Sequence, residues 1–459
     1  MRQLLAATSE RAISYLEQLE NRAVAPSEAA VQRLAEFDIP FPEHPVSPEL
    51  TLRQLDEAGS PATMAMAGPR FFGFVIGGTL PAALAASWLA TAWDQNSALY
   101  NVTPATAAIE QVALRWLLDV LRLPADSGGA FVTGTTVAHF SALSAARHAL
   151  LAKEGWNVEA DGLFGAPPLE VIVSEEAHPT LLKALAMLGL GRNRVVKIPV
   201  DGNGAVRLDR LPPLTSRSIV CVQAGNVNTG AFDPAGAVCE RARDAEAWVH
   251  VDGAFGLWAS AAPSLAQLAR GIELADSWAT DCHKWLNVPY DCGVAFVRDQ
   301  HALRAAMAIT AEYLPTASAH RNPADFTPEL SRRARGVEVW AALHSLGRTG
   351  LADMIERTCR HARRFADALR AAGCKILNEV VLNQVLVSFG NAETTMRIID
   401  DIQKDGTCWC GGTVWQGHTA MRISVVSWAT TDSDVERSID TILRIARSHQ
   451  AIRAIRAGL

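Results

Sequence analysis

Residues 276–293 read DSWATDCHKWLNVPYDCG, a stretch that indicates both the fold and the chemistry of the protein. The apolar segment Ser277–Thr280 predicts a buried strand, and Lys284 follows it beside His283 and Trp285. A lysine in apolar surroundings near another cation loses its proton more easily, which is what a Schiff-base amine requires. Because most lone lysines are solvated surface charges, the role of Lys284 depends on what else the chain brings to it.

A carboxylate ends the preceding apolar strand, in WVHVDGAFGLWA (248–259). In open α/β sheets ligands bind at the carboxyl ends of the strands, where Asp252 falls. A carboxylate at that edge could pair with a protonated pyridine nitrogen and keep the ring cationic, so that it accepts electrons. The alternative is an ordinary strand-end Asp that caps a turn.

Two further segments follow strand-like stretches. In FVTGTTVAHFSALSAARHALL (131–151), Gly134, Thr135 and Thr136 precede a helix, and the N–H groups and hydroxyls of such a turn can bind a phosphate. The segment lacks the Gly-Lys-Ser/Thr ending of a Walker loop. In VIVSEEAHPTLLKAL (171–185), His178 could stack on a flat ring, although most lone histidines are structural.

Apolar strands alternate with helical stretches between residues 61 and 320, which predicts an α/β domain with a mostly parallel sheet covered on both faces. Residues 1–60 are expected to form an N-terminal arm, with helices near 8–20 and 27–37 and a Pro-rich connector, IPFPEHPVSP (39–48). Residues 321–459 are expected to form a smaller C-terminal αβ domain. The other predicted strands are Glu170–Ser174, Val195–Ile198, Ile219–Val222, Trp248–Val251, Val294–Val297, Gln384–Phe389 and Met421–Val426. The predicted helices include Ala138–Ala152, Thr180–Leu188 and Arg335–Arg348.

Composition narrows the class of protein. The chain has 459 residues and a formal net charge of −6, without the basic excess typical of nucleic-acid binding. Its eight cysteines lack the paired spacing of structural zinc sites, so we expect no metal site and a cytoplasmic chain with reduced thiols. The N-terminus has no apolar signal region. The uncharged segment Phe71–Trp93 is interrupted by Gly77, Gly78 and Pro81, and we expect it to form a strand or loop and then a buried helix rather than a membrane span.

These segments, in this order, resemble the group II decarboxylases that depend on pyridoxal 5′-phosphate (PLP). The family includes aromatic-amino-acid, glutamate and diaminobutyrate decarboxylases. The most specific match is the H-V-D-x-A pattern of 250–254 followed by C-H-K-W at 282–285, and AGNVNTGAFDP (224–234) and MRISVVSWATTDSDVERSI (421–439) add to it. The resemblance covers residues 40–440 and implies the type I fold of PLP-dependent transferases, with a seven-stranded sheet and an active site at a homodimer interface.

The resemblance also implies roles for individual residues. Lys284 would bind the cofactor covalently, Asp252 would bind the pyridine nitrogen, and His178 would stack on the ring and assist the reaction. Tyr313, in ITAEYLPT (309–316), matches a loop tyrosine linked to protonation of the substrate carbon after loss of CO₂. The other expected contacts are also with the cofactor. Its phosphate would be bound by Thr135, Thr136 and His283. Asn226 would lie near the ring hydroxyl, and Ala254 would pack beneath the ring.

Substrate identity is left open by departures from the family pattern. Gly68-Pro69 stands where His-Pro is usual, Cys282 replaces a proline, and Pro179 follows His178. Phe72 and its aromatic neighbours could line a substrate pocket or form core, and Arg70 could meet an acidic side chain. Arg422 could bind a carboxylate, and a structural ion pair explains it equally well.

The predicted reaction is decarboxylation of an L-amino acid, with a weak preference for an aromatic one, to the amine and CO₂. The alternatives on the same fold are an aldehyde synthase, a C–C lyase and an aminotransferase, and Tyr313 favours simple decarboxylation. A non-catalytic PLP-fold binding protein would have no need of both Lys284 and Asp252.

Overall fold

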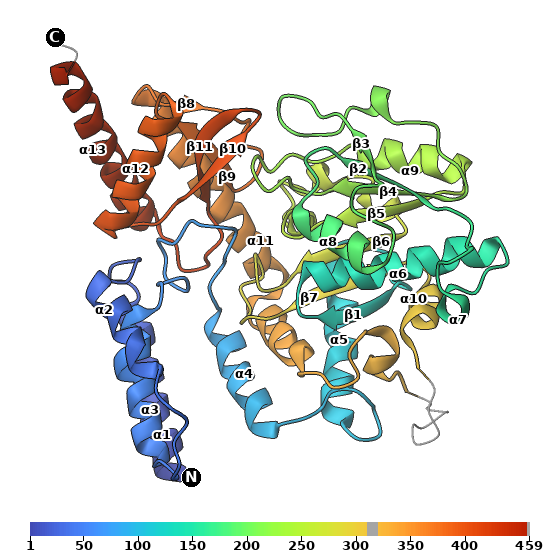
Figure 1. Ribbon diagram of the computed structural model, residues 1–459, viewed down its shortest axis with the longest axis horizontal. Coiled ribbons are helices and arrows are strands. Elements are labelled where there is room, and N and C mark those ends of the chain that lie inside the picture. The colour runs from blue at the N-terminus through green and yellow to red at the C-terminus, as the bar shows by residue number, and fades with distance from the viewer. Residues whose placement is uncertain (310–319, 457–459) are drawn as a thin grey trace. The chain divides into compact units, whose positions relative to one another are not determined.

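Seven strands form the larger sheet of the computed structural model, which describes residues 1–309 and 320–456 (Figure 1). The strand order is β1-β7-β6-β5-β4-β2-β3. Neighbours are parallel from β6 through β3, and β7 is antiparallel to both β6 and β1. The strands are β1 (Gly128–Val132), β2 (Glu170–Ser174), β3 (Val196–Ile198), β4 (Ser218–Gln223), β5 (Trp248–Asp252), β6 (Ser277–Asp281) and β7 (Gly293–Val297). The predicted α/β fold with a mostly parallel seven-stranded sheet is confirmed.

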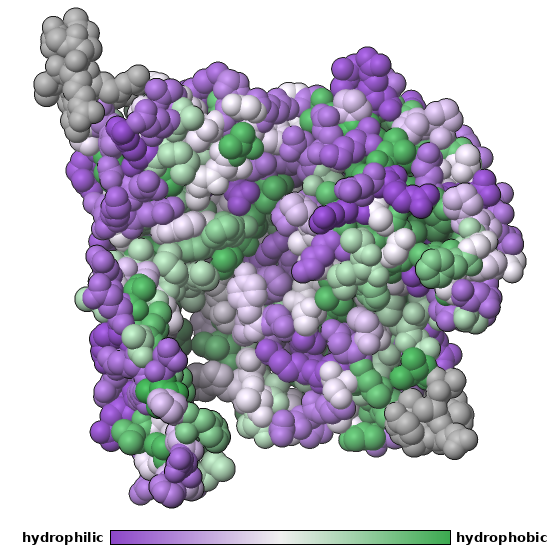
Figure 2. Space-filling view, viewed as in Figure 1, coloured by the Kyte–Doolittle hydropathy of each residue, from purple (hydrophilic) through white to green (hydrophobic). Residues whose placement is uncertain are grey.

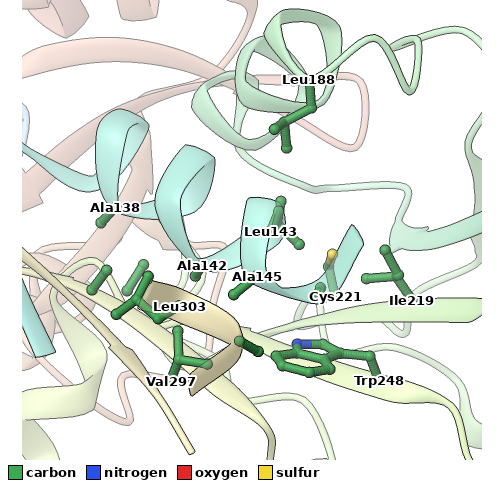
Figure 3. Packing of buried hydrophobic residues seen from close by; sticks show 14 of the residues in the cluster. Ala138, Ala142, Leu143, Ala145, Leu188, Ile219, Cys221, Trp248, Val297 and Leu303 are labelled. Atoms are coloured by element: carbon green, nitrogen blue, oxygen red, sulfur yellow. The ribbon is translucent and has the colours of Figure 1, made fainter. Parts of the chain in front are cut away.

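The helices that connect these strands cover both faces of the sheet. On β4, Ile219 and Cys221 pack into the core beneath α6 (Thr135–Lys153), while the buried Val220 and Val222 alternate with them and point to the opposite face. Figure 3 shows small side chains of α6 facing the sheet. Alanines at these positions let the helix approach the strands closely and bring its N-terminus to the strand ends. They are Ala138, Ala142 and Ala145.

The other helices and the second sheet have the following bounds. The remaining helices are α1 (Arg2–Gln18), α2 (Glu28–Gln32), α3 (Pro48–Gln54), α4 (Pro81–Trp93), α5 (Pro104–Val120), α7 (Val158–Asp161), α8 (Pro179–Met187), α9 (Ala235–Asp244), α10 (Gln300–Met307), α11 (Arg335–Ala371), α12 (Ala392–Asp405) and α13 (Asp432–Arg456). The four-stranded sheet has the order β10-β11-β9-β8, formed by β8 (Lys375–Ile376), β9 (Gln384–Ser388), β10 (Gly411–Trp415) and β11 (His418–Ser424). The helix α11 bends at Gly347, where φ is 60°.

The contacts divide the chain into two compact units. One comprises residues 77–362 and 378–384 and holds the seven-stranded sheet. The other comprises residues 1–76, 363–377 and 385–459, so the N-terminal helices share a unit with C-terminal elements. Within this second unit, Arg70 is 2% exposed and forms an ion pair of 2.9 Å with Asp434. The same guanidinium donates to the carbonyls of Thr407 and Glu20. Arg70 is therefore a structural residue, and its expected contact with an acidic substrate side chain is not supported.

The helix expected to start near Pro81 is present as α4, with Pro81 in its first turn. The expectation that this helix is buried is wrong for the single chain, because only Ala83 is buried and Trp88, Leu89 and Trp93 are 43%, 56% and 42% exposed. No helix in the described part of the chain is long and apolar enough to cross a membrane. An uncharged helix of 13 residues with its aromatic side chains in solvent is a surface that another chain could cover.

Candidate active site

The candidate site lies at the carboxyl ends of the parallel strands. Asp252 ends β5 and pairs in register with Ala279 of β6, which itself ends at Asp281. The turn after β1 leads into Thr135, the first residue of α6. Because these strands run in the same direction, the turns that follow them lie at one edge of the sheet. Chain segments that are more than a hundred residues apart thus contribute to one site.

Lys284 is held at this edge by a carboxylate. Its Nζ lies 2.8 Å from Oδ2 of Asp281, which is buried, while the lysine side chain is 22% exposed. The other oxygen of Asp281 accepts the N–H of Thr135 at 2.7 Å. Burial would raise the pKa of Asp281, but the charges of Lys284 and His283 and these hydrogen bonds lower it below its usual value. Asp281 therefore joins the lysine to the N-terminus of α6.

Side chains that can donate hydrogen bonds to a phosphate lie at that N-terminus. Gly134 caps α6 without a side chain, and a Cβ there would lie 3.2 Å from Cε1 of His283. Nδ1 of His283 accepts the N–H of Cys292 at 3.0 Å, so the proton of the neutral ring is on Nε2. Burial, together with the charge of Lys284, lowers the pKa of His283 and favours that neutral form. Within the described residues, the buried Oγ1 of Thr135 has no hydrogen-bond partner, which leaves it available to a ligand.

Asp252 is a buried carboxylate that remains ionised. It is 5% exposed, and its Oδ1 accepts the N–H of Ala254 at 3.2 Å. Its Oδ2 lies 3.5 Å from Nε2 of His139 on α6. Burial would raise the pKa of Asp252, but the neighbouring side chains of His139, His178 and Lys284 lower it well below its usual range. An ionised carboxylate held in this way is suited to bind a cationic ring nitrogen.

Comparison with known proteins identifies the group of enzymes to which these features belong. The family model described as the pyridoxal-dependent decarboxylase conserved domain matches residues 33–390. The chain belongs to the pyridoxal-dependent decarboxylases. It is a PLP-dependent carboxy-lyase, as predicted from the sequence.

Individual relatives agree with this assignment. Tryptophan decarboxylase 1 of Oryza sativa subsp. japonica is 28% identical over 454 residues, covering 90% of this chain and 87% of that protein. 4-Hydroxyphenylacetaldehyde synthase of Rhodiola rosea is 25% identical over 460 residues, covering 94% and 91%. The crystal structure of Oryza sativa TDC with PLP and tryptamine superposes with a TM-score of 0.90 at 24% identity, covering 97% of each chain, which shows a shared fold.

The residues of this decarboxylase fit its cofactor. The amine of Lys284, the ionised carboxylate of Asp252 and the unpaired hydroxyl of Thr135 are the groups that an aldehyde, a pyridinium nitrogen and a phosphate require. Thr136 is half-buried in the first turn of α6. Within residues 1–309 and 320–456, no group of three His, Cys, Asp or Glu side chains is arranged to hold a metal ion.

Three other residues expected from the sequence lie in turns after the strands. His178 caps α8, and its Nδ1 accepts the N–H of Thr180 at 3.3 Å, which puts the proton of the neutral ring on Nε2. Ala254 joins β5 to β6, since its carbonyl accepts the N–H of Asp281 at 2.9 Å. Asn226 is buried, and its Oδ1 accepts the N–H groups of residues 228 and 229, so its side chain shapes the turn after β4.

The remaining predicted residues lie elsewhere. Tyr313 is outside the described residues. Phe72 and Arg422 belong to the compact unit that contains the four-stranded sheet. Phe72 is 1% exposed and packs edge to face on Phe365, and burial lowers the pKa of Arg422 on β11. Phe72 thus has the surroundings of a core residue.

Two residues of the site were not predicted from the sequence. Asp281 is three positions before Lys284 at a predicted strand end, and a carboxylate at that spacing was the signal that could have identified it. His139 lies in the second turn of α6 and reaches Asp252 only through the packing of the helix on the sheet. No local pattern distinguishes it from a structural histidine.

Proposed function

We propose that this decarboxylase acts on an aromatic L-amino acid and releases the corresponding amine and CO₂. The observation that carries the proposal is an aromatic stack in the unit that contains residues 1–76. The ring of Trp409 lies between Phe71 and Phe74, at centroid distances of 5.0 and 5.6 Å. Phe74 is 60% exposed, so the stack presents a free aromatic face. The rice relative is a tryptophan decarboxylase, which supports the same class of substrate.

The proposed cofactor contacts follow from the site geometry. Lys284 holds the cofactor through its amine, and Asp252 holds the ring nitrogen in its cationic form. The bound cofactor supplies an electron sink for the electrons of the broken bond between Cα and the carboxylate. The phosphate is bound by Thr135, Thr136 and His283, and the ring is flanked by His178, Ala254 and Asn226.

The proposed reaction also needs residues that orient the substrate and move a proton. Tyr313 delivers a proton to Cα of the substrate after CO₂ has left, which favours an amine rather than an aldehyde product. Arg422 binds a carboxylate, and the buried Phe72 holds Trp409 through its backbone N–H, which donates to the carbonyl of Trp409 at 2.8 Å. Groups aimed at the charge that develops during bond cleavage accelerate the reaction more than groups that bind only the ground state.

We further propose that the chain is a cytoplasmic homodimer in which the arm of residues 1–60 packs across the partner. Apolar side chains are exposed on this arm, and Figure 2 shows apolar patches on the surface of the N-terminal helices. Leu5, Leu50 and Phe41 are 59%, 51% and 95% exposed, and α4 adds its own exposed tryptophans. Exposed apolar side chains of this kind are typical of subunit interfaces. The eight free cysteines are compatible with a reducing compartment.

A second candidate is oxidative decarboxylation to an aldehyde, which the similarity to 4-hydroxyphenylacetaldehyde synthase of Rhodiola rosea favours. The test is an absorbance spectrum of the purified protein and then a panel of L-amino acids with detection of CO₂, amine and aldehyde. Amine and CO₂ from tryptophan, tyrosine or phenylalanine support the proposal. Turnover of only acidic or basic amino acids would refute the aromatic preference, and aldehyde as the main product would establish the second candidate.

A further inference from the structure

A chain of buried polar groups runs from Asp252 into the core of the large sheet. Oδ2 of Asp252 lies 3.5 Å from Nε2 of His139, and Nδ1 of His139 lies 2.9 Å from Nε2 of His250. Nδ1 of His250 lies 2.8 Å from Oγ of Ser277, which accepts the indole N–H of Trp248 at 2.9 Å. The two histidines and Ser277 are fully buried. These hydrogen-bonded side chains thus connect α6, β5 and β6 behind the carboxylate.

Asp252 can only accept and Trp248 can only donate, which sets the direction of the hydrogen bonds between them when both rings are neutral. Oγ of Ser277 accepts from Trp248 and, in the direction that suits Asp252, gives its own proton to Nδ1 of His250. His250 then carries its proton on Nε2 and donates it to Nδ1 of His139. His139 in turn carries its proton on Nε2, which faces the acceptor-only carboxylate of Asp252. The opposite direction would place a ring lone pair against that carboxylate.

One ring nitrogen of His139, Nε2, lacks a good hydrogen-bond partner in the described part of the chain. Within the described residues, its buried Nε2 makes no hydrogen bond of good geometry, and the nearby acceptor is Asp252 at 3.5 Å. The other oxygen of Asp252 is already bound by the N–H of Ala254. The ionisable groups that face Asp252 are His139 from α6, His178 at the start of α8 and Lys284 after β6. Of these, His139 is fully buried, and a second buried donor fixes its orientation.

We infer that His139 is a positioning residue that, held by its hydrogen bond with His250 and by the bond of His250 to Ser277, orients Asp252 for the cofactor's ring nitrogen. The inference rests on the proposed role of Asp252 and deepens it. A buried pair of imidazoles is costly unless each hydrogen bond is made, and an apolar pair would fill the same space without that cost. Groups that orient a ligand from behind in this way commonly change its affinity about 10–100-fold when removed from metal sites, and we expect a similar effect here.

The test compares His139→Leu, which removes the donor, with His139→Gln, which can keep an N–H near the position of Nε2. His148→Leu is the matched control, because His148 is on the same helix and binds Glu159 at 2.6 Å on its outer side. The first readout is the dissociation constant of PLP from each protein. The second is the pH dependence of the bound cofactor's absorbance. We expect His139→Leu to weaken PLP binding about 10–100-fold and to shift that pH dependence. We expect His139→Gln to recover much of both, and His148→Leu to match the unchanged protein.

A measurement on the cofactor-free protein keeps the inference testable if His139→Leu fails to fold. ¹⁵N NMR of histidine-labelled protein should show a proton on Nε2 of both His139 and His250, and absence of that proton from His139 would overturn the inference. Asp252→Asn distinguishes the role of His139 from the role of Asp252 itself. If Asp252→Asn weakens PLP binding and His139→Leu does not, the inference fails and the role of Asp252 stands. If Asp252→Asn leaves PLP binding unchanged, the proposed role of Asp252 itself fails.

Discussion

Nζ of Lys284 lies 2.8 Å from Oδ2 of Asp281, and the same carboxylate accepts the N–H of Thr135 through its other oxygen. One buried side chain therefore orients the lysine and fixes the turn that leads into α6. The stability of this arrangement should depend on the charge of Asp281, because its pKa is lowered in the folded chain. Removing either partner would therefore leave the other without its ion-pair partner.

We predict that Asp281→Asn destabilises the cofactor-free protein by about 1–3 kcal/mol at pH 7, since a buried charge-assisted hydrogen bond is lost. A carboxylate with a lowered folded pKa stabilises the fold above its unfolded pKa of about 3.9 and loses that contribution as the pH falls. The difference from the unchanged protein should therefore shrink below about pH 4. Denaturant unfolding at several pH values measures it.

Asp353→Asn is the control for this experiment, because Asp353 is 65% exposed in an ion pair with Arg357 and should matter by less than about 1 kcal/mol. Equal unfolding free energies for Asp281→Asn and the unchanged protein at pH 7 would show that the Asp281–Lys284 pair does not stabilise the site.

Thr135→Val should separate folding from cofactor binding. Oγ1 of Thr135 is buried and has no partner among the described residues, so its loss should leave the free energy of unfolding unchanged or raise it by up to about 1 kcal/mol. PLP binding should weaken about 10–100-fold, because a hydrogen bond to a charged group is lost. Fluorescence titration with PLP measures the affinity. An unchanged dissociation constant would remove Thr135 from the phosphate site.

Acid should destabilise the protein through His250. Burial, and after it the neighbouring His139 ring, lower the pKa of His250 well below 6.5, whereas the unfolded residue binds a proton near pH 6.5. The contribution of its neutral form is complete above about pH 6.5 and is lost as the pH falls, by up to about 1.4 kcal/mol per pH unit. His250→Gln should flatten the pH dependence of unfolding between about pH 6.5 and 5.

His418→Gln is the matched control, since His418 is exposed on β11 and should leave this slope unchanged. If His250→Gln retains the full slope, another group is responsible for it.

Tyr313→Phe tests the fate of the substrate carbon. Without the phenol to deliver a proton to Cα, amine formation should fall by about 100-fold or more, the scale of general acid–base catalysis. Aldehyde should then become the larger product. Chromatographic quantification of amine and aldehyde from the same reaction measures the ratio. A full amine yield from the variant would refute the proposed role of Tyr313.

The sequence predicted the large sheet well because each of its buried strands is a short apolar run followed by a turn. β5 ends at Asp252, where a carboxylate was expected, and β6 ends at Asp281, one residue beyond the predicted strand, so the edge of the sheet that holds Lys284 was predicted although the role of Asp281 was not. Short or glycine-rich strands were missed, including β8 with two residues and β10, which begins Gly411-Gly412. The helix predicted over Arg335–Arg348 ends close to the non-helical Gly347, and a second helix, which was not predicted, follows it to Ala371.

Residues that act through tertiary contacts could not be predicted from local pattern. His139 and His250 are far apart in the sequence, and they meet only because the alanines of α6 let the helix pack closely on β5. The exposure of α4 was missed for a related reason. An apolar helix looks the same in sequence whether it packs inside its own chain or offers its surface to another.

The most direct test of the central claim is to reduce the PLP-loaded protein with borohydride, digest it and locate the pyridoxyl group by mass spectrometry. We expect the peptide containing Lys284 to carry the added mass, and Lys284→Ala to lose both this label and the release of CO₂. A Lys153→Ala control, at an exposed surface ion pair, should retain both. A label on a different lysine, or CO₂ release at the unchanged rate from Lys284→Ala, would contradict the account.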